Sequence, residues 1–432
     1  MPVSAKSVMP TPYWAAPGAA LYLGDVRECL RALPARSVQC VVTSPPYWGL
    51  RSYLPGDHAD KVSEIGAEPS PDCGTQGQAQ CGGCFVCSMV DVFREVRRVL
   101  RDDGVLWLNL GDTYSGGNRG AGGKLQDGHK QSTNVGSAFS HDRDLVPAAR
   151  AGGSGVSSGN LVGVPWRVAL ALQADGWMLR SDLPWVKRGA MPEPTTSRPC
   201  KSLEYVFLLA KGDGYYFDAD AGRTARSWRN GDLWFASVDE PHGMVGIGDE
   251  VVGLDVTSGS RKSSKKLHFA TFPPRLVEPL VLAGTSAHGC CSGCGAPWER
   301  IVCRVGGAST GPDSRDVRDR SYDWSRNGKP GSGSTLDGTV ARRETAGWRR
   351  ACGCQVNEVV PCVVLDPFAG SGTTVATAIQ LGRRGVGIDL SENYLLHSAI
   401  PRIVAAQSGA PTRASTVAAP EVSVPPVRRM RT

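Results

Sequence analysis

The sequence predicts an α/β protein built on a doubly wound, mostly parallel sheet, and two observations support that prediction. Short apolar runs at 38–42, 105–110 and 363–365 alternate with segments whose apolar residues recur at helical spacing. The last of these runs continues into a glycine-containing turn, a helix and a further strand that ends at Asp389, which is the order of a mononucleotide-binding βαβ unit. A cysteine-rich insertion and loop insertions interrupt this pattern.

The composition is that of a globular protein with many loops. Of its 432 residues, 41% are hydrophobic and 21% are charged, and 53 glycines and 30 prolines separate the regular elements. A formal charge of +7 is too small to predict nucleic-acid binding by itself. Because we find no apolar run of about 18 residues and no N-terminal signal sequence, we expect a cytoplasmic protein with no membrane partner. In that compartment the 14 cysteines are more typical of thiols or metal ligands than of disulfides.

The expected elements follow from apolar periodicity and from helix-ending residues. We expect strands at 21–25, 38–42, 105–110, 179–185, 205–210, 363–365 and 386–389, and helices at 26–33, 90–100, 165–175, 274–283 and 373–381. The acidic triplet 102–104, Asp-Asp-Gly, is expected to end the helix before it. The stretches 114–163 and 405–432 show no sustained periodicity, which predicts a mobile Gly/Ser-rich loop and a disordered tail.

The segment 366–374 has the features of a loop that binds a nucleotide-like ligand. Gly370 and Gly372 allow the backbone to approach a ligand, and the next strand ends in Asp389, a carboxylate placed to accept hydrogen bonds from a ribose diol. Val375 occupies the third glycine position of a dinucleotide fingerprint, and no Gly-Lys-Ser/Thr follows as in a P-loop. A purely structural glycine turn is the alternative to a ligand loop.

A second motif, Ser44-Pro45-Pro46-Tyr47, follows an apolar strand. The two prolines restrict the turn, so that the Ser44 side-chain oxygen and the Pro45 carbonyl become fixed hydrogen-bond acceptors. Tyr47 offers an aromatic face, which Trp48 extends. Such a turn can hold a flat ring and draw the hydrogens of its amino group toward sp3 geometry, so that the nitrogen lone pair can attack an electrophile. The alternative is a plain strand-ending turn with Tyr47 packed in the core.

With these two motifs in this order, the sequence resembles the β-class, site-specific amino-methyltransferases of DNA, in which a Pro-Pro-Tyr motif precedes the S-adenosylmethionine loop. The resemblance covers most of the chain, over the segments 21–48, 91–116, 180–218, 268–285 and 364–390. It implies an S-adenosylmethionine-dependent methyltransferase fold and transfer of a methyl group to the exocyclic amine of a flipped base in double-stranded DNA. A cognate restriction endonuclease is the further partner that such an enzyme implies.

The resemblance also implies roles for individual residues. Ser44, Pro45, Pro46 and Tyr47 would be catalytic. The cofactor would be contacted by Asp25 near its adenine, Thr271 and Pro273 at its methionine end, Asp389 at its ribose, and by Asp366, Phe368, Gly370, Gly372 and Thr373. Ser44 stands where adenine-N6 enzymes usually carry Asp or Asn, which favours cytosine N4 as the target and leaves adenine N6 as the alternative.

The same resemblance divides the chain into segments with different expected tasks. Residues 1–220 would form the catalytic half of the domain, with a cysteine-rich insertion at about 66–89. Residues 268–404 would form the cofactor half, with a zinc insertion at about 288–360. Residues 221–267 would read the DNA sequence, because their arginines and lysines suit phosphates and guanine edges. A solvated linker is the alternative for that stretch. The Gly-rich loop 114–163 and the zinc insertion, with Arg342, Arg343, Arg349 and Arg350, are the alternative DNA contacts.

Two cysteine clusters point to structural zinc. One joins Cys291-Ser-Gly-Cys294 to Cys352-Gly-Cys354, and the other gathers Cys73, Cys81, Cys84 and Cys87. Four thiolates at tight turns suit tetrahedral zinc and leave no open position for water, so each metal would act as a scaffold. Free thiols are the alternative. Cys290 and Cys303 lie near the first set, and Asp72 could replace Cys73 in the second.

Two other functions compete with DNA methylation. A protein or RNA N-methyltransferase with a Pro-Pro-Tyr motif would usually carry Asn before it and its cofactor loop upstream, whereas here the loop lies downstream. A catalytically inactive, zinc-containing DNA-binding protein could keep the fold, but both motifs are intact. Binding of S-adenosylmethionine separates this second rival from an enzyme.

Overall fold

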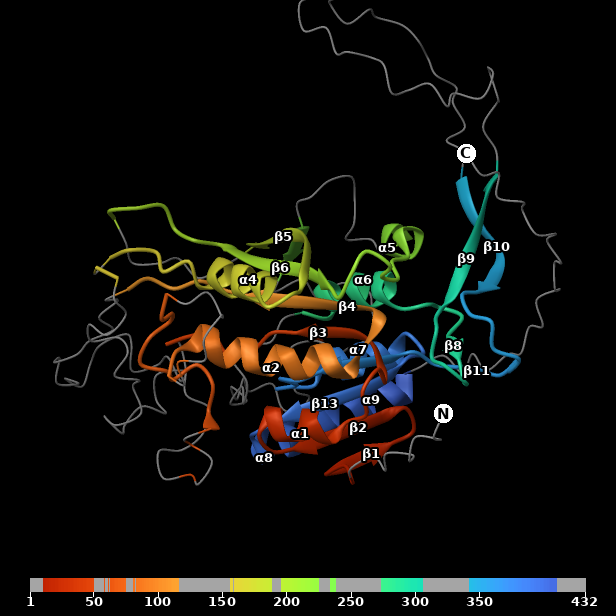
Figure 1. Cartoon of the computed structure of the whole chain (residues 1–432), viewed down its shortest axis with the longest axis horizontal. Helices are drawn as coiled ribbons and strands as arrows, with labels where there is room; N and C mark the ends of the chain where they lie inside the picture. Colours follow the sequence, from red (N-terminus) through yellow and green to blue (C-terminus); the bar gives the residue numbers. More distant parts are fainter. Residues whose placement is uncertain are drawn as a thin grey trace, which may run out of the picture. The chain divides into compact units, whose positions relative to one another are not determined.

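The computed structural model describes residues 11–49, 58, 61, 63–74, 81, 83–115, 156–157, 159–188, 196–224, 234–237, 273–305 and 342–409. The chain divides into two compact units. The main unit comprises Met1–Trp298 and Arg350–Ser415, and the smaller one comprises Glu299–Arg349 and Thr416–Thr432. The main unit contains the large sheet and both motifs singled out above, and its elements can be followed in Figure 1.

A nine-stranded sheet forms the centre of the described part of the main unit. Its strands are β1 (Trp14–Ala16), β2 (Ala19–Leu23), β3 (Val38–Thr43), β4 (Leu100–Leu110), β5 (Met178–Arg188), β6 (Leu203–Ala210), β7 (Trp234–Ser237), β12 (Val363–Asp366) and β13 (Arg384–Asp389). Their order is β1-β2-β13-β12-β3-β4-β6-β5-β7, and the run from β2 to β4 is parallel throughout. β1 is antiparallel to β2, and β6 is antiparallel to both β4 and β5. The predicted doubly wound, mostly parallel sheet is therefore confirmed.

The direction of winding reverses between β12 and β3, which lie side by side in parallel. From β12 the chain proceeds to β13 on one side, whereas from β3 it proceeds to β4 on the other. In open α/β sheets a reversal of this kind favours a crevice at the carboxyl ends of the two strands, because the connecting segments turn away in opposite directions. Ser44 follows β3 and Pro367 follows β12, so both sequence motifs meet at this edge.

Helices cover both faces of the sheet. One face carries α1 (Val26–Ala32), α2 (Phe85–Val99) and α4 (Val164–Ala174), and the other carries α6 (Pro274–Gly284), α7 (Thr373–Gln380) and α9 (Ile400–Gly409). Successive side chains of β4 point to opposite faces of the sheet, so this strand contributes to the apolar cores on both faces. Leu106 and Leu108 join the core with α2, while Val105 and Trp107 join the core with α6. The short helical segments are α5 (Ala219–Thr224), α8 (Glu392–Tyr394) and the π-helical turn η5 (Leu395–Ala399).

α2 forms because its apolar residues recur at helical spacing. Phe85, Met89 and Phe93 are fully buried, and each side chain of this kind contributes roughly 1.5–3 kcal/mol when it leaves water. The helix begins at Phe85, earlier than the predicted residue 90, because Cys84 caps it. The Cys84 sulfur accepts the backbone N–H of Cys87 at 3.4 Å, which satisfies one of the free donors of the first turn.

The acidic triplet 102–104, predicted to end α2, instead forms a bulge inside β4. The pairing of β4 with β3 begins at Leu100 and resumes at Val105, so the triplet falls between two strand pairs. Gly104 is required there, because a Cβ at this position would lie 2.8 Å from the backbone oxygen of Gln39. A glycine after two acids suits a bulge as well as a helix end, and the sequence pattern did not separate the two.

Two strand pairs belong to the region between α6 and β12. β8 (Cys290–Cys291) pairs with β11 (Val359–Val360) in the main unit. β9 (Trp298–Val305) and β10 (Arg342–Arg350) form a separate two-stranded sheet, in which Arg349 forms an ion pair with Glu299. These pairs are the described part of the insertion that was expected at 288–360.

Some of the expected segments fall at the limits of the described residues. The tail was predicted to start at residue 405, which is too early, because α9 continues to Gly409 and Ala406 is buried in the same apolar cluster as Val375. Most of 114–163 and 221–267 lies outside the described residues, as does 410–432. Among the residues that the structure describes, no helix is long and apolar enough to cross a membrane.

Candidate active site

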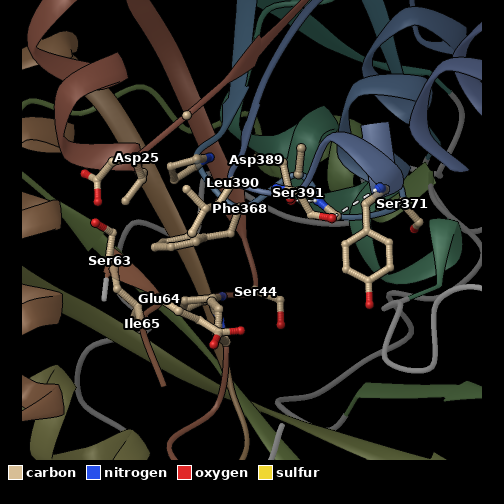
Figure 2. Close-up of a pocket in the computed structure, with 18 of the residues that line it drawn as sticks. Asp25, Ser44, Ser63, Glu64, Ile65, Phe368, Ser371, Asp389, Leu390 and Ser391 are labelled. Carbon is tan, nitrogen blue, oxygen red and sulfur yellow. Dashed lines mark hydrogen bonds between the residues drawn. The ribbon is translucent and has the colours of Figure 1, made fainter. Parts of the chain in front are cut away.

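A pocket opens at the carboxyl edge of the parallel strands, where the two sequence motifs meet. Its free volume, including open solvent at its mouth, is about 970 Å³. Four of the lining segments follow or end parallel strands: 24–26 after β2, 44–47 after β3, 367–371 and Thr373 after β12, and 389–391 with Tyr394 at the end of β13. The fifth segment, 63–65, precedes α2 in the chain. Figure 2 shows Phe368 near the centre of this group, with Asp25 and Ser63 on one side of it and Asp389 and Ser391 on the other.

The two glycines of the 366–374 loop have different tasks. Gly370 has a φ of 50°, and its backbone N–H donates to the Asp389 carboxylate over 2.7 Å, so it forms part of the pocket wall. Gly372 has a φ of 75° and is the N-cap of α7, where a Cβ would come within 2.9 Å of Ala399. Gly372 is therefore needed for helix packing, and it does not line the pocket.

Asp366 joins the two motifs from beneath the pocket. Its carboxylate accepts hydrogen bonds from the Thr43 hydroxyl at 2.7 Å and from the Phe368 backbone N–H at 3.1 Å. Thr43 directly precedes Ser44, so one buried acid connects the two loops. Burial raises the pKa of Asp366 to about 6, although these hydrogen bonds favour its charged form. The residue is 1% exposed and is not part of the pocket lining.

Asp389 presents a carboxylate to the pocket at the end of β13. One of its oxygens accepts the Gly370 backbone N–H at 2.7 Å, and the other accepts the Ser391 backbone N–H at 2.8 Å. Burial raises the pKa of Asp389 to about 6, against the effect of these two donors. The group therefore titrates just below neutral pH, and its charged form can accept further hydrogen bonds from the hydroxyl groups of a ligand.

Asp25 is a second acid in the pocket wall, at the N-terminus of α1. It caps this helix by accepting the Arg27 backbone N–H at 2.8 Å, and it pairs with the Arg27 guanidinium at 2.7 Å. Burial alone would raise the pKa of Asp25, but the hydrogen bonds and charge of Arg27 outweigh it, and the pKa is lowered. Asp25 is therefore a fixed and charged acceptor at neutral pH.

Ser44 and Tyr47 belong to a polar network whose other members come from three strands. The Tyr47 hydroxyl donates to Glu204 of β6 at 2.7 Å, and it lies 3.4 Å from the Ser44 hydroxyl. The Asn109 amide of β4 donates to the Tyr47 oxygen at 2.9 Å and to Ser44 Oγ at 3.2 Å. Asn109 also donates to Glu204 at 3.1 Å, and Lys187 of β5 forms an ion pair with the same carboxylate. The hydroxyl groups of both motif residues are thereby fixed.

The two aromatic residues of the motif differ in exposure. Tyr47 lines the pocket and packs closely on Gly111, where a Cβ would lie 2.6 Å from its ring. Trp48 is 3% exposed, belongs to the α2 core and donates its indole N–H to the Glu68 backbone carbonyl at 2.9 Å. The prediction that Trp48 extends the aromatic face was wrong, because the turn directs it into the core.

The pocket brings together most of the residues that the sequence predicted for it. The predicted residues in its lining are Ser44, Pro45, Pro46, Tyr47, Asp25, Phe368, Gly370, Thr373 and Asp389. Pro273 is the buried N-cap residue of α6 and is not among the lining residues. Thr271 lies outside the described residues.

Three members of the polar network, Asn109, Lys187 and Glu204, were not predicted from the sequence. Asn109 and Glu204 are 3% and 9% exposed, and each interrupts an otherwise apolar strand segment. That interruption is the signal that could have found them, because a polar group at a buried strand position must be hydrogen-bonded. The wall segment 63–65 was also missed, since its Ser-Glu-Ile sequence has no pattern typical of a binding site.

The first cysteine cluster, Cys73, Cys81, Cys84 and Cys87, gathers at the start of α2. Its four sulfur atoms all lie within 4.8 Å of one another. Asp72, the alternative ligand, is engaged elsewhere, because its two oxygens accept hydrogen bonds from the Gly74 backbone N–H and the Arg167 guanidinium. The four cysteines are thus placed together, as a metal site requires.

The second cysteine cluster, Cys291, Cys294, Cys352 and Cys354, gathers beside β8 and β11. Its sulfur atoms also lie within 4.8 Å of one another. Gly295 follows the first pair with a φ of 73°, and its backbone N–H donates to the Cys291 carbonyl at 2.7 Å, which closes a tight turn. Cys290 is turned away toward the Val360 carbonyl, and Cys303 contacts the Glu344 carbonyl. Neither belongs to the cluster.

A family model described as DNA methylase, of the N6 and N4 type, matches residues 38–291 and 362–399. The match includes both motifs of the pocket. It omits 292–361, which contains three of the four cysteines of the second cluster. That insertion therefore lies outside the part of the chain that the family model matches.

Two similar proteins are named as Type II methyltransferases. The chain is 38% identical over 268 residues to M.Cfr9I of Citrobacter freundii, across 62% of this chain and 73% of the relative. It is 32% identical over 374 residues to M.SmaI of Serratia marcescens, across 87% of each chain.

Solved structures also resemble the chain over most of its length. The PvuII DNA methyltransferase (cytosine-N4-specific) is 15% identical with a TM-score of 0.45, across 90% of this chain and 91% of its own. A putative DNA modification methylase of Thermus thermophilus, TTHA0409, complexed with S-adenosyl-L-methionine, is 19% identical with a TM-score of 0.41, across 90% of this chain and 96% of its own.

Proposed function

The chain belongs to the N6/N4 family of DNA methylases, and we propose that it transfers the methyl group of S-adenosylmethionine to N4 of a cytosine in double-stranded DNA. The observation that carries this proposal is a single pocket in which Ser44 and Tyr47 share the lining with the Gly370 loop. Direct transfer requires that a methyl donor and a flat amine meet in one space, and these two loops enclose such a space.

The cofactor side of the pocket offers groups that fit S-adenosylmethionine. We assign the ribose diol to the Asp389 carboxylate, and the adenine end to the region of Asp25 and Phe368. When bound there, the cofactor supplies an electrophilic methyl group. Asp366 and Gly372 do not line the pocket, so we assign them to shaping the loop rather than to contacting the cofactor.

The base side of the pocket is assigned to Ser44, Pro45 and Tyr47. The Ser44 side-chain oxygen and the Pro45 carbonyl accept the two hydrogens of the amine, which localises the lone pair of the nitrogen. The Tyr47 ring stacks on the flipped base, and its hydrogen bonds to Asn109 and Glu204 keep the ring in one orientation.

A hydrogen-bonded path can remove the proton that the reaction releases. Methyl transfer leaves a positive charge on the amine nitrogen, which must then lose one proton. The Ser44 oxygen accepts that proton while the Ser44 hydroxyl proton moves to the Tyr47 oxygen, 3.4 Å away. The Tyr47 hydroxyl proton moves in turn to the Glu204 carboxylate, at 2.7 Å. The Glu204 carboxylate, which is held in place by its ion pair with Lys187, is the proton acceptor at the end of this path.

The target base is assigned from Ser44. Adenine-N6 enzymes of this family usually carry Asp or Asn at this position, whereas a serine resembles the cytosine-N4 enzymes. The DNA sequence would be read by 221–267, most of which lies outside the described residues. Because relatives are named as Type II methyltransferases, we propose that the protein acts in the cytoplasm beside a restriction endonuclease of the same specificity.

We also propose that each cysteine cluster holds one structural zinc ion. A tetrahedral zinc with bonds of about 2.3 Å to sulfur places its sulfur atoms roughly 3.8 Å apart, which fits four sulfurs within 4.8 Å. Four thiolates fill the coordination sphere, so neither metal would take part in the chemistry.

The proposal is tested by incubating the full chain with double-stranded DNA and S-adenosylmethionine and separating the nucleosides by mass spectrometry. We expect N4-methylcytosine. N6-methyladenine would overturn the assignment of the base but not of the reaction. If calorimetry also detects no binding of S-adenosylmethionine, the inactive DNA-binding protein is favoured instead.

A further inference from the structure

The geometry of the first cysteine cluster fits a metal better than a disulfide. The Cys73 and Cys87 sulfur atoms lie 3.6 Å apart, far longer than a disulfide bond of about 2.05 Å but close to the edge of a zinc–thiolate tetrahedron. The Cys84 sulfur accepts the Cys87 backbone N–H, a hydrogen bond that stabilises a thiolate. Cys84 and Cys87 belong to the start of α2, whereas Cys73 belongs to the segment before it. One ion would therefore join that segment to the helix.

The segment 63–74 continues from the pocket wall to this cluster. Its backbone carbonyls at Ser70 and Pro71 accept the N–H groups of Phe85 and Val86, the first donors of α2, at 3.0 and 3.1 Å. These contacts lie next to Cys73 and to Cys84, so a metal would close a ring of interactions around them. Among the described residues of the segment, Ile65 joins the apolar core and Pro71 is also buried, whereas the other side chains are polar, small or partly exposed. Apolar burial alone therefore gives this wall little support.

Further contacts connect the segment to both sides of the pocket. The Glu68 backbone carbonyl accepts the Trp48 indole N–H at 2.9 Å, directly beside Tyr47. The Gly66 carbonyl accepts the Gly49 backbone N–H at 2.8 Å, and the Ser63 carbonyl accepts the Arg27 guanidinium at 3.3 Å. A displacement of the segment would thus disturb the position of the catalytic turn and of the arginine that holds Asp25.

We propose that one zinc ion on Cys73, Cys81, Cys84 and Cys87 holds the segment 63–74 against α2 and thereby orders the wall of the cofactor pocket. This inference rests on the proposed function, because it concerns S-adenosylmethionine in the same pocket. Loss of the metal leaves the sheet and the apolar face of α2 in place and lowers the fraction of molecules with an ordered wall. If one molecule in ten keeps the wall, the apparent Kd for the cofactor rises about tenfold.

Two matched double variants of the full chain test this coupling. Cys73→Ser with Cys81→Ser removes ligands of the first cluster, and Cys291→Ser with Cys294→Ser removes ligands of the second. Elemental analysis of freshly purified protein should find two zinc ions in the parent and one in each variant. Calorimetry should show a Kd for S-adenosylmethionine that rises roughly tenfold only in the first variant.

A second measurement guards against misfolding of the first variant. The Cys291→Ser/Cys294→Ser variant retains only the first site. Its zinc is removed with a thiol-specific mercurial, excess dithiothreitol then displaces the mercurial from the cysteine sulfurs, and zinc chloride returns the metal. Loss and recovery of cofactor affinity with the metal would support the proposal. Finding no zinc in the parent, finding iron in its place, or an unchanged Kd after the first site loses its zinc would overturn it. A parent that holds both zinc ions but binds no S-adenosylmethionine would instead overturn the proposed function.

Discussion

The two sides of the pocket that we assign to the cofactor and to the base are constructed in different ways. On the cofactor side the backbone N–H groups of Gly370 and Ser391 fix the Asp389 carboxylate. Asp389 ends β13, Ser391 follows the same strand, and Gly370 follows the neighbouring β12. On the base side Ser44 and Tyr47 depend on side chains from β4, β5 and β6. A wall made by backbone is sensitive to the charge of the acid that it holds. A wall made by side chains is sensitive to single substitutions in distant strands.

The largest effect is expected on the base side. Ser44→Ala removes an acceptor for the amine hydrogens and should lower kcat by roughly 100- to 1,000-fold, the range found when one preorganised hydrogen-bonding partner is lost. The Kd for S-adenosylmethionine, measured by calorimetry, should stay within about twofold, because Ser44 acts on the base. A large loss of cofactor affinity in this variant would place Ser44 on the wrong side of the pocket.

Asp389→Ala tests the cofactor side in the same way. Hydrogen bonds to a charged group are worth roughly 1.5–3 kcal/mol, so the Kd for S-adenosylmethionine should rise between about tenfold and 150-fold. Glu392→Ala is the matched control, since Glu392 is a nearby acid that bonds to Tyr13 and does not line the pocket. Equal effects in the two variants would show that general charge, and not the ribose contact, is responsible.

The pH dependence of cofactor binding should reveal the raised pKa of Asp389. Its pKa of about 6 lies above the ordinary value, so the free protein takes up a proton on this group near pH 6. Binding needs the charged form, and affinity should therefore be constant above pH 7 and fall by roughly tenfold between pH 7 and 5. The Asp389→Asn variant should bind S-adenosylmethionine weakly at every pH, and its affinity should change little between pH 7 and 5. A parent whose affinity rises on acidification would contradict the assignment.

Glu204→Gln should have the smallest effect of the set. It keeps the shape of the side chain but removes the acceptor at the end of the proton path, and we expect kcat to fall by several-fold to about tenfold. Stopped-flow measurement of methyl transfer should detect this fall in rate. The Kd for S-adenosylmethionine should not change. An unchanged kcat would mean that water takes the proton and that Glu204 only positions Tyr47.

The difference between the two sides also explains what the sequence could predict. The 366–374 loop and Asp389 lie close together in the chain, so this part of the cofactor side follows from a local sequence pattern, and these residues also lie together in the structure. The roles of Gly372 and Asp366 could not be predicted from the local sequence. Gly372 packs against Ala399 and Asp366 accepts a hydrogen bond from Thr43, and both partners are distant in the chain.

The base side could be predicted only in part. Ser44 and Tyr47 were found from the Pro-Pro turn, but Asn109 and Glu204 reach them through strand pairing over long separations in the sequence. Likewise the bulge at 102–104 depends on the partner strand and not on the triplet itself. Contacts of this kind follow from the order of the sheet, which periodicity alone does not determine.

Single-turnover methyl transfer to DNA, with the cofactor concentration varied, tests the two-sided pocket most directly. With Asp389→Ala the rate should be low at limiting S-adenosylmethionine and approach that of the parent at saturation, because only cofactor affinity is lost. With Ser44→Ala the rate should stay low at every cofactor concentration, because the amine is no longer held for attack. If saturating cofactor restores Ser44→Ala but not Asp389→Ala, the assignment of the two loops to base and cofactor is contradicted.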